Sequence, residues 1–121
     1  MVLESITDVM PNPDALERVI VADDHPLFRA ALAAALKRVA PAAEIVEAES
    51  LEAAKRALDG ADAGLICLDL HMSDSAGFVG LAELRRARPA IPVVVVSASQ
   101  APGVAARALE FGASGFIPKT A

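Results

Sequence analysis

Three short apolar runs, each ending in a polar residue, constrain the fold of this chain more than any other feature. They cover residues 18–24, 64–69 and 93–98. A continuous apolar run indicates a strand buried on both faces, as in a parallel sheet covered by helices. Ligands of such sheets bind beyond the carboxyl ends of the strands. The runs therefore predict a site as well as a fold, and we expect Asp69 to lie at its centre.

Helical patterns alternate with these runs, and proline, serine and glycine mark their ends. The predicted helices lie between Pro26 and Pro41, Ser50 and Gly60, Gly77 and Pro89, and Pro102 and Gly112. Residues 44–49 alternate between apolar and acidic, which predicts a less buried edge strand, and residues 115–117 begin a fifth strand. The alternation of strand and helix predicts an α/β fold with a doubly wound parallel sheet.

The predicted sheet begins at residue 18, so residues 1–17 form a leader and residues 18–121 a single domain. Apolar residues in the leader recur at helical spacing until Pro11 and Pro13 break the pattern. They are Val2, Leu3, Ile6, Val9 and Met10. We expect either a short amphipathic helix or a disordered leader.

Composition excludes several function classes. The net charge of −5 and the pI near 4.9 argue against DNA binding by this piece, which requires Lys and Arg to neutralise phosphates. No apolar run approaches the roughly 18 residues of a membrane span, and no signal-peptide pattern opens the chain. The lone Cys67 leaves no disulfide within the chain, which fits a reducing cytoplasm.

Polar residues follow four of the predicted strands and should meet at one edge of the sheet. They are Asp23, Asp24, Asp69, Ser97 and Lys119. Neighbouring carboxylates repel one another unless a cation joins them, and oxygen ligands suit Mg²⁺. A carboxylate beside a divalent ion and a lysine can accept a phosphoryl group as an acyl phosphate. Each member of the set therefore has a role in in-line phosphoryl transfer.

Four motifs resemble a known family: Val21–Pro26, Leu68–Leu70, Val96–Ala98 and Gly115–Lys119. Over about residues 18–120 the sequence resembles a response-regulator receiver domain of bacterial two-component signalling, most like those of LuxR-type transcriptional regulators. The resemblance implies a flavodoxin-like five-stranded parallel sheet in the order 2-1-3-4-5. It also implies an Mg²⁺ cofactor and a conformational switch that controls a DNA-binding output.

The resemblance also implies roles for single residues. Asp69 would be the phosphoacceptor and would ligate Mg²⁺ together with Asp24, while Asp23 would act largely through water. The backbone carbonyl of His71 would be a further ligand.

Three other roles concern the phosphoryl group and its donor. Ser97 and Lys119 would bind the phosphoryl oxygens, and Phe116 would be the aromatic residue that changes rotamer as Ser97 moves. The donor would be a phosphohistidine of a sensor histidine kinase, and the only chemistry would be phosphorylation and dephosphorylation of Asp69 itself.

The sequence departs from the family pattern at three places. Ser73 stands where the family usually has proline, which should loosen the loop after Asp69. Pro118 precedes Lys119 and Thr120 follows it, which leaves open whether a cis bond occurs here. The chain also stops where a fifth helix is expected, and it contains no output domain.

Loss of the fifth helix would expose an apolar face of the sheet, and exposed apolar patches mark partner sites or instability. We expect a second copy of the chain, as a homodimer, or the leader helix, in cis or swapped, to cover this face. The sequence is equally interpretable as a piece of a longer regulator.

Two other functions and one other metal compete with the leading interpretation. An aspartate-nucleophile phosphatase would carry a second acid two residues after Asp69, where this chain has His71. An interaction domain could keep the fold without phosphorylation, although the complete acid set argues against it. His25 and His71 with the acids could suggest zinc, but their spacing is not that of a tetrahedral site.

Overall fold

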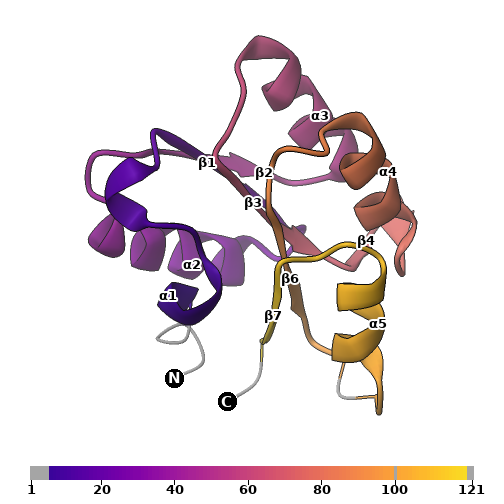
Figure 1. Ribbon diagram of the computed structural model, residues 1–121. Helices are drawn as coiled ribbons and strands as arrows, with labels where there is room; N and C mark the ends of the chain where they lie inside the picture. Colours follow the sequence, from indigo (N-terminus) through magenta and orange to yellow (C-terminus); the bar gives the residue numbers. More distant parts are fainter. Residues whose placement is uncertain (1–5, 100, 120–121) are drawn as a thin grey trace.

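Five parallel strands form one central sheet, and helices cover both of its faces (Figure 1). The structure is a computed structural model that describes residues 6–99 and 101–119. Its elements are α1 (Ile6–Val9), η2 (Pro13–Ala15), β1 (Arg18–Ala22), α2 (Pro26–Val39), β2 (Glu44–Ala48), α3 (Leu51–Gly60), β3 (Leu65–Asp69), β4 (His71–Met72), β5 (Ser75–Ala76), α4 (Val79–Ala87), β6 (Val93–Ser97), α5 (Val104–Glu110) and β7 (Gly115–Pro118). The strand order β2-β1-β3-β6-β7 is the predicted order 2-1-3-4-5, and β2 lies at an edge as expected.

Alternate residues of each central strand enter two separate cores, which explains why the predicted strands are apolar throughout. In β6, Val93 and Val95 belong to the core beneath α3, α4 and α5. Val94 and Val96 belong to the opposite core, beneath α2. Strands that bury both faces in this way hold their carboxyl ends in fixed positions.

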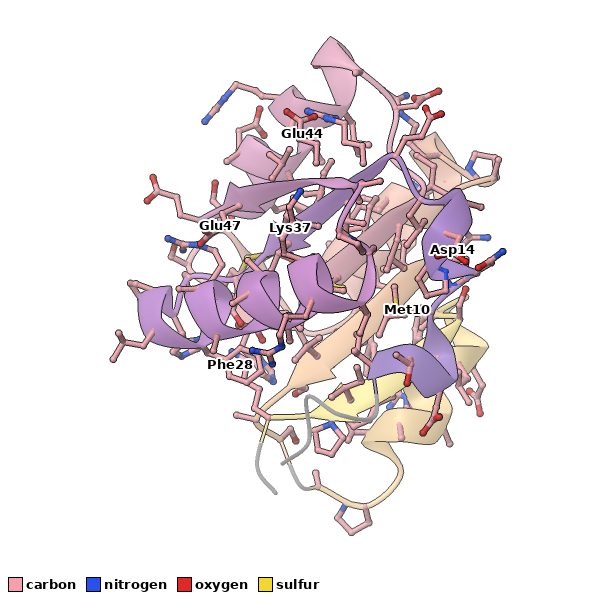
Figure 2. All side chains as sticks on the ribbon, turned by 90° about the vertical axis from the view of Figure 1, so that its left-hand side faces the viewer. Met10, Asp14, Phe28, Lys37, Glu44 and Glu47 are labelled. Carbon is pink, nitrogen blue, oxygen red and sulfur yellow. The ribbon has the colours of Figure 1, made fainter. Side chains whose placement is uncertain are left out.

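The leader forms the helix α1, which lies against β7 on the same face as α2; Figure 2 looks onto this face. Ile6 is fully buried and shares a core with Ile117 of β7. Val9 packs so closely over Gly115 that a Cβ placed on this glycine would lie 2.5 Å from the Val9 Cβ. The leader helix therefore covers the outer strand of the sheet in cis. Val2 and Leu3 lie outside the described residues.

The loop after β3 contains an antiparallel pair, β4 and β5, where the sequence predicts only a polar loop. Each of these strands has two residues, which is too short to give an alternating pattern in the sequence. Asp74 in the turn between these strands accepts hydrogen bonds from the backbone N–H groups of Leu51 and Glu52, each at 3.0 Å. The predicted cap of the same helix also forms, since the Ser50 hydroxyl accepts from the Ala53 N–H. Two side chains therefore cap α3, and only one of them is local in sequence.

No peptide bond among the described residues is cis, so the bond before Pro118 is trans. In the part of the chain that the structure describes, no helix is both long and apolar enough to cross a membrane.

Candidate functional site

Four parallel strands end at one edge of the sheet, and their polar residues meet there as predicted. Asp23 directly follows β1 and Asp69 ends β3. Ser97 ends β6, and Lys119 directly follows β7. The pairing of β6 with β7 continues as a hydrogen bond from the Lys119 N–H to the Ser97 carbonyl, 2.8 Å long. The register of the sheet thus fixes the backbone positions of the site.

Lys119 joins the two most buried carboxylates. Its Nζ lies 2.8 Å from Asp23 Oδ2 and 3.2 Å from Asp69 Oδ2. The side chains of both aspartates are only 2% exposed, and that of Lys119 is 8% exposed. A pair of buried charges is stable only when each is matched, and Lys119 is the one lysine among the described residues that reaches them.

The pKa values of the two buried aspartates are shifted in opposite directions. Burial raises the pKa of Asp69, and the nearby Asp23 charge adds to this increase. Burial also acts to raise the pKa of Asp23, but the Lys119 ammonium and the N–H groups of His25 outweigh it and hold this pKa below its usual value. Asp23 is therefore the fixed anion of the pair, and Asp69 would benefit most from an additional positive charge.

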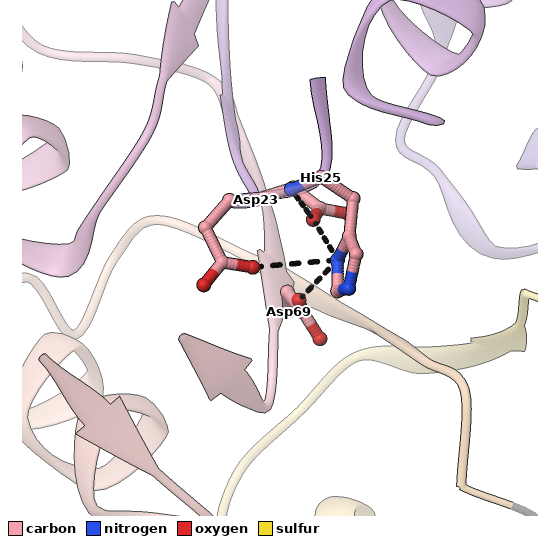
Figure 3. A group of neighbouring side chains, drawn as sticks. Asp23, His25 and Asp69 are labelled. Atoms are coloured by element: carbon pink, nitrogen blue, oxygen red, sulfur yellow. Dashed lines mark hydrogen bonds and ion pairs between the residues drawn. The ribbon is translucent and has the colours of Figure 1, made fainter. Parts of the chain in front are cut away.

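His25 enters the site, which the sequence does not predict. Its Nδ1 lies 2.8 Å from Asp23 Oδ1 and 3.5 Å from Asp69 Oδ2 (Figure 3). It also lies 3.3 Å from Asp24 Oδ1. The same nitrogen lies 2.8 Å from Lys119 Nζ. The backbone N–H of His25 also donates to Asp23 Oδ1, at 2.8 Å. This hydrogen bond closes a turn that places the imidazole over the acids. The only sequence signal is the position of His25 directly after the acid pair.

Asp24 lies at the rim and ties the site to the loop after β3. Its side chain is 31% exposed, and Oδ2 accepts a hydrogen bond from the Ser73 N–H at 3.2 Å. A proline at position 73 has no N–H and could not make this bond. The departure from the family pattern thus supplies a contact between loop and acid.

Ser97 lies in β6 and Phe116 in β7, the strands predicted to carry them. Among the described hydrogen bonds, none joins Ser97 to Asp69. The Ser97 hydroxyl is fully buried and accepts from the Ser99 N–H at 3.1 Å. Phe116 is half-buried and packs against the core beneath α3, α4 and α5. Both residues thus lie on the strands that flank the acid site.

His71 contributes its backbone rather than its ring. Its N–H donates to Asp69 Oδ1 at 3.2 Å, and its side chain is exposed. This is the position at which a phosphatase of similar fold would need an acid.

The side chains of Asp23, Asp24, His25 and Asp69 could hold a metal ion together. Each offers one ligand atom, and these atoms lie within 4.8 Å of one another. Asp23 Oδ2 is buried without a hydrogen bond, because the Lys119 contact lacks hydrogen-bond geometry. Carboxylate oxygens are the ligands that Mg²⁺ prefers, so the residues present fit a divalent cation.

Comparison with known proteins identifies the family. The family model of the response regulator receiver domain matches residues 19–121. The chain belongs to this family. It is a receiver domain of the kind found in response regulators, and the predicted flavodoxin-like fold is confirmed.

Relatives of this receiver domain include regulators of transcription. It is 43% identical over 105 residues to a glycerol metabolism activator of Pseudomonas putida, a match that covers 85% of this chain and 47% of that protein. It is 32% identical over 109 residues to the probable transcriptional regulatory protein NarL of Mycobacterium tuberculosis, covering 90% of this chain and 50% of the relative. The chain thus spans about half the length of these relatives.

A solved structure supports the same assignment. The signal receiver domain of the M. tuberculosis response regulator NarL superimposes with a TM-score of 0.73 at 30% identity, covering 87% of this chain and 85% of that one.

Proposed function

We propose that Asp69 accepts a phosphoryl group from the phosphohistidine of a sensor histidine kinase, and that this event controls the output of a longer regulator. The observation that carries the proposal is the position of Asp69, which lies buried at the carboxyl end of β3 and shares the Lys119 ammonium with Asp23. No chemistry beyond phosphorylation and dephosphorylation of Asp69 is proposed for this domain.

The ionised Asp69 carboxylate would act as the nucleophile. One of its oxygens forms a bond to phosphorus while the bond between phosphorus and the donor nitrogen breaks, and the departing imidazole keeps the electron pair. Lys119 Nζ, 3.2 Å from Asp69 Oδ2, offsets the negative charge that gathers on the phosphoryl oxygens.

The metal expected here is Mg²⁺, which when bound supplies positive charge to the phosphoryl oxygens and to Asp69. Asp24 and Asp69 would ligate it directly, Asp23 largely through water, and the His71 carbonyl would be a further ligand. Because the pKa of Asp69 is raised in the absence of metal, this cation would also favour the ionised nucleophile.

The response to phosphorylation would begin at Ser97. Its hydroxyl, which now accepts from the Ser99 N–H, would turn to a phosphoryl oxygen, and Phe116 would change rotamer as the strand end moves. In the whole protein, which we place in the cytoplasm, this switch would act on a DNA-binding output and on homodimerisation.

The first prediction tests the phosphoacceptor. Asp69→Asn should abolish labelling by acetyl phosphate in the presence of Mg²⁺, because an amide cannot act as this nucleophile. Intact-mass spectrometry would measure the addition of one phosphoryl group. Asp14→Asn, which changes an exposed aspartate of η2, is the matched control and should label normally. Labelling of the Asp69→Asn variant at another residue would overturn the assignment.

Binding of beryllofluoride distinguishes this proposal from a domain that only keeps the fold. A receiver that accepts phosphoryl groups should bind beryllofluoride in the presence of Mg²⁺. An interaction domain that is not phosphorylated should not bind beryllofluoride under the same conditions. The Asp69→Asn variant supplies the negative control.

A further inference from the structure

His25 makes two contacts at one nitrogen that cannot both be hydrogen bonds. Nδ1 lies 2.8 Å from Asp23 Oδ1, which can only accept, and 2.8 Å from Lys119 Nζ, which can only donate. If Nδ1 carries a proton, the proton faces an ammonium. If it carries a lone pair, the lone pair faces a carboxylate. In either tautomer one of these contacts is repulsive without a further charge between the groups.

A divalent cation removes this conflict. An imidazole lone pair and carboxylate oxygens are attracted to the same metal ion, so a repulsive contact becomes shared coordination. Lys119 keeps its contacts with two carboxylates when it gives up the imidazole.

The spacing of the candidate ligand atoms agrees with this arrangement. Neighbouring ligands at about 2.1 Å from an octahedral ion lie about 3.0 Å apart. Nδ1 lies 3.3 Å from Asp24 Oδ1 and 3.5 Å from Asp69 Oδ2, the oxygens of the two proposed direct ligands.

We propose that His25 is a nitrogen ligand of the metal site and shifts its preference from Mg²⁺ toward borderline transition ions such as Mn²⁺ and Co²⁺. Imidazole nitrogen suits transition ions, whereas Mg²⁺ favours an all-oxygen set. The inference rests on the proposed function only in using the same metal site.

The experiment uses the untagged full chain after removal of metals with EDTA. Calorimetric titration measures the affinities for Mg²⁺, Mn²⁺ and Co²⁺ separately, and pulsed EPR of bound Mn²⁺ detects coupling to a nitrogen nucleus. The test variant is His25→Gln. The control is Leu27→Gln, which alters the same turn at a side chain that is 89% exposed.

Wild type and Leu27→Gln should show nitrogen coupling. His25→Gln should lose this coupling, and its Mn²⁺ and Co²⁺ affinities should fall at least about tenfold, since even the loss of an outer-shell partner costs about 10- to 100-fold. Its Mg²⁺ affinity should change little. Incorporation of ¹⁵N-histidine into His71→Gln, which keeps His25 as its one histidine, should change the coupling, and this tests the assignment even if His25→Gln does not fold.

Absence of histidine coupling in the wild type, or an equal loss of affinity for all three ions, would overturn the proposal. Labelling by acetyl phosphate with Mg²⁺ is scored separately in the same samples. If Asp69 is labelled but nitrogen coupling is absent, the ligand assignment fails and the phosphoacceptor proposal stands. If nitrogen coupling is present but Asp69 is not labelled, the ligand assignment stands and the phosphoacceptor proposal fails.

Discussion

Asp23 and Asp69 show how two residues of one type, equally buried, acquire different properties from their neighbours. Asp23 receives the N–H of His25 and lies nearer to Lys119 Nζ, and its pKa is lowered. The contacts of Asp69 with Lys119 Nζ and with the His71 N–H are longer, each 3.2 Å, and burial raises the pKa of Asp69. In the metal-free protein, ionised Asp69 therefore opposes folding.

The pKa of Asp69 predicts a pH-dependent effect of Asp69→Asn. A carboxyl whose pKa is higher in the folded protein than in the unfolded chain destabilises the fold once pH rises above the unfolded value. In EDTA at pH 7, the substitution should raise the free energy of unfolding by roughly 0.5–2 kcal/mol, the usual range for a single stabilising change. Urea denaturation would measure it.

Two controls accompany this measurement. The gain should shrink as pH falls toward the ordinary aspartate value of 3.8, where Asp69 protonates in both states. Added Mg²⁺ should reduce or reverse it, since the metal favours the wild type. A gain that does not depend on pH would show that charge at Asp69 is not its cause.

At the scale of elements, α1 belongs to the core although it is only a short helix. Ile6 is 1% exposed and packs with Ile117. Ile6→Ala should therefore lower the free energy of unfolding by about 2 kcal/mol or more, the usual cost of truncating a buried isoleucine to alanine. Thermal and urea denaturation would measure this loss. Thr7→Ala, at the exposed neighbouring position, should have little effect, and equal effects of the two would contradict the packing of α1.

Asp74 links the loop beside the site to α3. Two backbone N–H groups, of Leu51 and Glu52, hold the pKa of Asp74 below 3.8. A carboxyl with a lowered folded pKa stabilises the protein above the unfolded value, and this stabilisation is lost as pH falls through the folded value.

Asp74→Asn should consequently cost about 0.5–1 kcal/mol at pH 7, the low end of the range for an exposed cap. The difference from wild type should narrow below pH 3.8. Chemical denaturation across pH would measure both effects, with Asp14→Asn as the control. A cost that persists at low pH would mean that the carboxylate charge is not what caps the helix.

For the whole molecule, the sequence predicts those features that depend on neighbouring residues along the chain. Apolar runs predict the central strands, Ser50 predicts a cap that forms, and the strand ends bring Asp23, Asp69 and Lys119 together. Features that depend on side-chain direction or on contacts across the fold are not predicted. The turn of the His25 ring over the acids is of this kind, as is the Asp74 cap, which lies more than twenty residues from the two N–H groups that it accepts from.

The packing of α1 over β7 also bears on where the folding unit begins. The family match starts at residue 19, yet Ile6 and Leu16 already lie in the core beneath α2. A fragment cut at the family boundary would expose Ile117 and the strand that positions Lys119. The geometry of Lys119 therefore depends on a stretch of chain that lies outside the sequence by which the family is recognised.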